Sequence, residues 1–129
     1  MRVLLSIKPE FAEKIFDGTK KYEFRRIVFK DPSVKTIVVY ASSPVQKVIG
    51  EFEIETILNY EIDKLWEKTK EFSGITEKFF FEYFSDKDKG FAIKVKRVKR
   101  YKEALCIKEA FNATPPQSFM YIENECIMS

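Results

Sequence analysis

The chain has 129 residues, of which 45% are hydrophobic, 16% aromatic and 33% charged, so a single domain over residues 1–129 is expected and intrinsic disorder is excluded. Histidine is absent, which excludes His-dependent catalytic triads, HExxH zinc sites and imidazole general bases. The net charge of +3, from 23 Lys and Arg residues against 20 Asp and Glu residues, permits nucleic acid as a partner without requiring it.

A strand followed by a short helix opens the chain. Residues 3–7 are mostly aliphatic, and Pro9 can occupy the first turn of a helix. Apolar residues then recur at helical spacing through Phe16, and Gly18 stands where a left-handed C-cap falls. We therefore expect a strand and a capped helix of two turns.

Three further strands are predicted before the middle of the chain. Residues 21–27 alternate in character, so Glu23 and Arg25 project to the same side of an extended backbone. Residues 36–41 are rich in β-branched side chains and form a largely buried strand. Residues 48–58 alternate apolar positions with glutamates, which predicts one core face and one acidic, solvated face.

Helical spacing replaces this alternation in the middle of the chain. Residues 62–69 form one helical segment, and an aromatic-rich segment around residues 79–84 forms a second. The two helices are expected to pack together over the sheet. Aromatic residues at helical spacing are usually core, so we assign this role to Trp66 and to the aromatic stripe, with Phe81 as the one possible contact residue. The aromatic residues of this segment are Phe79, Phe80, Phe81 and Tyr83, of which Phe81 lies off the main stripe.

The strand period returns late in the chain with an irregularity. Val98 is out of phase with Ile93 and Val95, which predicts a bulge near residues 96–97. A short helical turn around residues 108–111 follows.

Strands on both sides of a helical insert predict an α+β fold, either a small curled mixed sheet or a partly open barrel with helices covering its ends. Residues 30–35 are too few for a helical crossover, so a doubly wound parallel sheet is disfavoured.

The two cysteines, Cys106 and Cys126, lie far apart and form no CxxC motif. This usage indicates a reducing, cytosolic setting, and a disulfide between them is open but not expected. No segment approaches the roughly 20 apolar residues of a membrane span, and the amino terminus lacks the apolar region of a signal peptide. A soluble, cytoplasmic protein with no membrane partner, no metal and no cofactor is expected, and its oligomeric state is left open.

The segment from Gly18 to Arg25 concentrates the chemistry of the chain. Lys20 stands at the entrance of a strand, and Glu23 and Arg25 share one of its sides. A carboxylate flanked by fixed donors suits the edge of a base or a phosphate. The alternative is a solvated, salt-bridged face, in which each exposed pair contributes at most about 1 kcal/mol.

The spacing Gly-x-Lys-x-x-Glu-x-Arg resembles the signature of the ASCH domains of the PUA-like superfamily. Further segments resemble the branch of this family labelled predicted transcriptional regulators, and they follow one another over nearly the whole chain. These segments are Leu5-Ser6-Ile7-Lys8-Pro9, Tyr40-Ala41-Ser42-Ser43-Pro44, Val48-Ile49-Gly50-Glu51-Phe52 and Pro115-Pro116-Gln117-Ser118-Phe119.

The resemblance implies a mixed β-barrel of about six strands with helices packed around it, and a cleft that binds RNA or a nucleotide. It places Lys20, Glu23 and Arg25 in this cleft and gives Gly18 a structural role. Weaker candidates for the cleft walls are Ser6, Lys8, Ser42, Ser43, Gln117 and Ser118.

Some members of the family are enzymes, namely acetylcytidine amidohydrolases, and ribonuclease activity is proposed for others. The amidohydrolases have a threonine just after the motif lysine, whereas here Lys21, Tyr22 and Glu23 follow Lys20 and Thr19 precedes it. Amide hydrolysis by that route is therefore not expected. An enzyme acting on a modified nucleoside or RNA, with Lys20 and Glu23 as amine and general base, is the alternative to a binding module.

The densest basic run of the chain offers a second candidate surface. Arg97, Lys99 and Arg100 could follow a phosphate backbone, with Tyr101 stacking on a base. Alternatively, this strand lies beside the acidic strand and its cations form cross-strand ion pairs. The acidic strand carries Glu51, Glu53 and Glu55, and ion pairing is favoured for Lys94 and Lys96. A DNA-binding regulator has little support, because no helix-turn-helix with a basic recognition helix is found.

Overall fold

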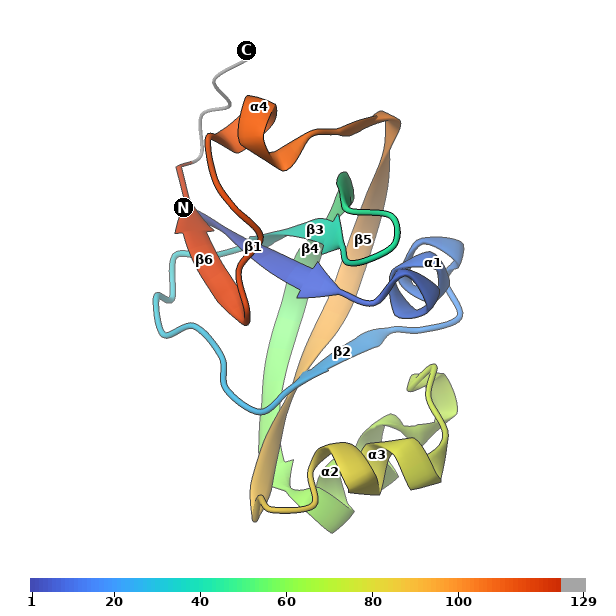
Figure 1. Cartoon of the computed structure of the whole chain (residues 1–129). Coiled ribbons are helices and arrows are strands. Elements are labelled where there is room, and N and C mark those ends of the chain that lie inside the picture. Colours follow the sequence, from blue (N-terminus) through green and yellow to red (C-terminus); the bar gives the residue numbers. More distant parts are fainter. Residues whose placement is uncertain (124–129) are drawn as a thin grey trace.

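A computed structural model describes residues 1–123 and contains one six-stranded sheet with helices at its side and ends (Figure 1). The strands are β1 (Arg2–Ile7), β2 (Tyr22–Arg25), β3 (Thr36–Ala41), β4 (Lys47–Glu61), β5 (Lys89–Leu105) and β6 (Phe119–Ile122). The helices are α1 (Pro9–Asp17), α2 (Ile62–Thr69), α3 (Glu77–Tyr83) and α4 (Ile107–Phe111), with a short 3-10 turn η1 (Lys70–Phe72).

The predicted elements are confirmed with small differences in their ends. Helix α1 begins at Pro9 and ends before Gly18, whose φ of 89° is the left-handed cap that the sequence indicated. Strand β2 is shorter than expected, and it ends at Arg25. Strand β6 follows the Pro115-Pro116 pair, where the sequence indicated no element.

The strand order is β2-β5-β4-β3-β1-β6, so the sheet is mixed and open. β1 pairs with β3 in parallel, and the other neighbouring strands pair in an antiparallel way. The expected α+β class and mixed sheet are confirmed, but the mixed β-barrel that the family resemblance implied is wrong, because the sheet does not close into a barrel. The two end strands, β2 and β6, have four residues each and pair only with β5 and β1.

Strands β4 and β5 form a long ribbon that connects the two ends of the molecule (Figure 1). Arg97 faces Glu53 whereas Val95 faces Ile54, so the residue between them on β5 bulges out of the ladder. This confirms the bulge near residues 96–97. One end of the ribbon pairs with β3, and the other end carries α2 and α3.

Three apolar clusters hold the elements together. Strands β1 and β3 are buried on both faces, because Val3 faces a cluster that includes residues of α1 while Leu4 faces a second cluster that includes residues of α4. The third cluster joins α2 and α3 to β2 and β5. In it, the Trp66 and Phe80 rings lie 4.9 Å apart and the Phe24 and Phe80 rings 5.3 Å apart. The two helices therefore pack together against the sheet, as predicted.

Among residues 1–123, no helix is long and apolar enough to cross a membrane. In the same part of the chain, no group of three or more His, Cys, Asp or Glu side chains has an arrangement that could hold a metal ion. Cys106 is a free thiol in the described chain. Its suggested partner Cys126 lies outside the described residues.

Replacing Gly50 by alanine is expected to destabilise the fold by about 1–3 kcal/mol. A Cβ at this position would lie 2.6 Å from the carbonyl oxygen of Lys99 and 2.6 Å from Cζ of Phe16, so β4 and β5 would have to separate. Urea denaturation followed by circular dichroism measures the change. Lys47→Ala, at an exposed position of the same strand, is the control and should stay within about 0.5 kcal/mol of wild type. Equal midpoints for Gly50→Ala and wild type would contradict the expectation.

Candidate functional site

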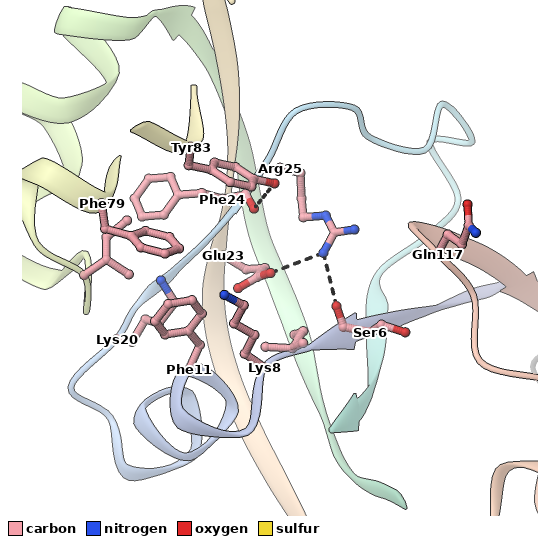
Figure 2. A pocket seen from close by; sticks show the side chains of 12 residues that line it. Ser6, Lys8, Phe11, Lys20, Glu23, Phe24, Arg25, Phe79, Tyr83 and Gln117 are labelled. Carbon is pink, nitrogen blue, oxygen red and sulfur yellow. Dashed lines mark hydrogen bonds and ion pairs between the residues drawn. The ribbon is translucent and has the colours of Figure 1, made fainter. Parts of the chain in front are cut away.

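A cavity of about 290 Å³ opens between β1, α1, β2 and α3 (Figure 2). One side of it is polar and charged, and the other is aromatic. The lining residues are Ser6, Ile7, Lys8, Phe11, Lys20, Glu23, Phe24, Arg25, Ile75, Phe79, Tyr83 and Gln117. The cavity therefore collects side chains from segments that are far apart in the sequence.

Half of the residues that the sequence singled out meet at this cavity. They are Ser6, Lys8, Lys20, Glu23, Arg25 and Gln117. Ser118 contacts Arg25 directly through its carbonyl oxygen and its hydroxyl. Ser42 and Ser43 lie in the turn after β3 and do not line the cavity. Ser42 N–H donates to the Ile7 carbonyl at 3.0 Å, so this turn is held at the end of β1 without lining the cavity.

Lys20 is buried to an extent that is unusual for a lysine, with 2% of its surface exposed. Its Nζ donates a hydrogen bond of 2.7 Å to the carbonyl oxygen of Ser73 and lies 4.8 Å from the centre of the Phe24 ring. Burial lowers the pKa of Lys20 to about 8, although the charge of Glu23 opposes this shift. Near neutral pH, this amine is therefore closer to losing its proton than an exposed lysine.

The connection between η1 and α3 covers Lys20. Gly74 in this connection has a φ of +69°, and a Cβ there would lie 2.5 Å from Cβ of Lys20. Lys21 N–H donates to the Phe72 carbonyl at 2.9 Å, and Lys14 Nζ donates to the Gly74 carbonyl at 3.1 Å. A glycine with positive φ thus lets the backbone close directly over the stem of the motif lysine.

Glu23 is the second buried charge of the cavity, with 6% of its surface exposed. Alternation along β2 directs it to the same side as Arg25, as the sequence predicted, and its Oε2 lies 3.4 Å from Nη1 of Arg25. Burial raises the pKa of Glu23, while the positive charges of Lys20 and Arg25 oppose this shift. Lys8 and Lys20 line the same cavity as this carboxylate (Figure 2).

Arg25 spans the open side of the sheet. Its Nη1 donates to the Ser6 carbonyl on β1 at 3.4 Å, and its Nη2 donates to the Ser118 carbonyl just before β6 at 3.0 Å. The guanidinium group therefore connects β2 to the opposite end of the sheet without a backbone ladder. The planar fork of donors makes arginine suited to this task.

The aromatic side of the cavity comes from α1 and α3. Phe11 and Phe79 meet edge to face at 5.3 Å, and the Phe79 and Tyr83 rings are nearly parallel with their centres 6.3 Å apart. Lys8 Nζ lies 5.4 Å from the centre of the Phe79 ring. Rings arranged in this way offer faces on which a flat ligand can stack.

The sequence-based assignment of the α3 stripe to the core is wrong for Phe79, and it holds only in part for Tyr83, which packs against the third cluster but also lines the cavity. Phe80 is fully buried in the third cluster, whereas Phe79 and Tyr83 are only half buried and line the cavity. Phe81, named from the sequence as the one possible contact residue, packs against Trp66 in the third cluster instead. The spacing of four residues between Phe79 and Tyr83 was a usable signal, because it puts both on a face adjacent to the buried one.

The basic run of β5 lies away from the cavity and makes ion pairs. Lys94 Nζ lies 3.0 Å from Glu55, and Arg97 Nε lies 2.8 Å from Glu53 on the neighbouring strand β4. Arg100 instead makes a bidentate contact with Glu13 of α1, at 2.9 and 2.5 Å. Lys99 is exposed and faces Glu51 across the two strands.

Comparison with known proteins shows the family of this chain. The family model described as ASCH domain matches residues 5–117. The large ribosomal subunit protein uL22 of Ureaplasma parvum serovar 3 is 28% identical over 121 residues, covering 94% of this chain and 39% of that protein. The chain thus spans well under half of this relative. An ASCH domain-containing ribonuclease of Zymomonas mobilis is 30% identical over 125 residues, covering 95% of this chain and 84% of that protein.

The fold agrees with a solved relative. The crystal structure of ASCH from Zymomonas mobilis is similar with a TM-score of 0.86 and 29% identity, covering 95% of this chain and 88% of that chain. The narrower resemblance to predicted transcriptional regulators finds no support in these names, one of which is a ribonuclease.

The burial of Lys20 predicts a specific dependence of stability on pH. Because its pKa is about 8 in the folded chain and 10.5 when exposed, the unfolded chain binds this proton more strongly between these values. The stability of wild type relative to Lys20→Met should therefore rise by about 3 kcal/mol from pH 8 to above pH 10.5.

Urea denaturation of both proteins across this pH range measures the difference. Lys21→Met, at the exposed neighbouring position, is the matched control. The stability of this variant should change with pH in the same way as that of wild type. If the difference in unfolding free energy between wild type and Lys20→Met does not change with pH, the Lys20 proton is not linked to folding.

Proposed function

This chain belongs to the ASCH domain family, and on that premise we propose that it binds RNA and holds one unpaired nucleotide in the cavity of Lys20, Glu23 and Arg25. The observation that carries the proposal is the division of the cavity into an aromatic side and a polar, charged side. Single-stranded RNA is recognised by stacking of unpaired bases on aromatic rings and by hydrogen bonds to base edges. The cavity provides both kinds of contact.

The size of the cavity supports a single nucleotide. Its volume of about 290 Å³ is at the lower end of the roughly 300–1,000 Å³ of small-molecule pockets. A duplex cannot enter such a space, whereas one base turned out of a strand can. A carboxylate deep in the cavity repels phosphate, so we place the base inside and the backbone outside, near the exposed Lys8.

The basic run of β5 has a lesser part in this proposal. Arg97 and Arg100 are held by carboxylates, so only the exposed Lys99 is a candidate for added backbone contact. A regulatory role, which the family resemblance implied, would act through the same RNA binding.

Phe79→Ala is expected to weaken the binding of single-stranded RNA by between about fivefold and 100-fold, because stacking contributes about 1–3 kcal/mol per base. Fluorescence anisotropy with a labelled, mixed-sequence RNA at low salt measures the affinity. Phe72→Ala removes a phenylalanine that is 44% exposed and lies outside the cavity, and it should bind as wild type does. No binding by wild type, or equal loss in both variants, would refute the proposal.

A second candidate, RNA cleavage, is favoured by Lys20 together with the relative named as a ribonuclease. An unprotonated Lys20 amine can accept the proton of a ribose 2′-hydroxyl. The 2′-oxygen then attacks the adjacent phosphorus, and the bond from phosphorus to the 5′-oxygen breaks. The 5′-oxygen takes a proton from water, and a 2′,3′-cyclic phosphate remains on the other fragment.

If the chain cleaves RNA in this way, the rate should rise with pH through about 8, the pKa of Lys20, and then level off. Lys20→Arg keeps the charge but cannot lose its proton near this pH, so it should reduce the rate by about 100-fold or more. Denaturing gels of end-labelled RNA measure both effects, and mass spectrometry identifies the cyclic phosphate. Intact RNA at every pH would leave binding as the function and exclude cleavage.

A further inference from the structure

We propose that Glu23 selects the base, so that the cavity accepts a base with an exocyclic amino group and discriminates against uracil. This inference rests on the proposed function, since it assumes that an RNA base enters the cavity. It concerns the specificity of the site, which the family relationship does not supply.

Arg25 makes its hydrogen bonds with groups of the protein itself. Its Nη1 donates to the Ser6 carbonyl and to Glu23, and its Nη2 donates to the carbonyl and the hydroxyl of Ser118. Both terminal nitrogens therefore already have acceptors within the fold. We infer that Arg25 is a positioning residue, which fixes the Glu23 carboxylate rather than contacting the ligand.

Glu23 keeps an acceptor for the ligand. Its Oε2 accepts a hydrogen bond from Arg25. Its Oε1 has no hydrogen-bond partner among the described residues, and this atom is partly accessible to solvent. The side chain lines the cavity, so this oxygen is reached from the cavity. An ionised carboxylate can only accept hydrogen bonds. Burial is the larger effect and raises the pKa of this carboxyl, while Arg25, hydrogen-bonded to Oε2, and the charge of Lys20 stabilise the ionised form against it.

A carboxylate in this position sorts the bases by their donors. Guanine, adenine and cytosine each carry an exocyclic amino group that can donate a hydrogen bond to Glu23. Uracil has no amino group, and its N3–H donor lies between two carbonyl oxygens. When this N–H approaches Glu23, a carbonyl oxygen is brought against the carboxylate in a desolvated space, so two acceptors face each other without a donor.

Affinity for single bases tests the inference. The probes are fluorescein-labelled RNA pentamers made of abasic units with one central guanine, adenine, cytosine or uracil, and a fully abasic pentamer measures backbone binding. Fluorescence anisotropy should show the three amino-bearing bases binding between about fivefold and 100-fold more tightly than uracil. Equal binding of all four bases above the abasic pentamer would overturn the inference and leave the proposed function standing. Failure of every base to exceed the abasic pentamer would overturn both.

Glu23→Gln isolates the cause, because an amide both donates and accepts and no longer penalises a carbonyl. The preference over uracil should fall to about twofold or less in this variant. Glu67→Gln makes the same chemical change at an exposed position of α2 and should keep the full preference. Thermal unfolding confirms that each variant is folded, and Glu23→Leu serves as a second test if Glu23→Gln does not fold. Full preference in a folded Glu23 variant would overturn the inference.

Discussion

The contacts of Arg25 connect the two ends of an open sheet, and the cavity depends on them. Strand β2 has no ladder to β1 or β6, yet the Arg25 guanidinium reaches the Ser6 and Ser118 carbonyls across the gap. A backbone ladder would bring these strands to about 4.8 Å from one another and leave no space between them. A long side chain holds them further apart, so a cavity remains along this side of the sheet.

The helical insert between β4 and β5 completes this cavity. It supplies the Ser73 carbonyl that accepts from Lys20 and the aromatic rings of Phe79 and Tyr83. Burying a lysine and a glutamate in one cavity costs free energy that a structural role alone does not require. Buried ionisable groups with shifted pKa values are found more often at functional sites, which agrees with a cavity built for a ligand.

Much of the fold was predictable because local patterns carried it. The cap at Gly18, the alternation that sends Glu23 and Arg25 to one side, and the bulge at residues 96–97 are confirmed. Each depends on residues that are neighbours in the chain. The short strand β6 has no such local pattern, since its identity as a strand comes from pairing with β1 at the other end of the chain.

By itself, the sequence determined every strand but β6, the main helices, the α+β class, the absence of histidine chemistry and the three motif residues that share a cavity. Only the tertiary structure decided that the sheet stays open, that Arg25 bridges it and that Phe79 and Tyr83 line the cavity. The reason is physical: periodicity reports whether a side chain points inward, but not what it meets there. The carbonyls of Ser6, Ser73 and Ser118 that hold the charged groups come from distant segments, and only folding brings them together.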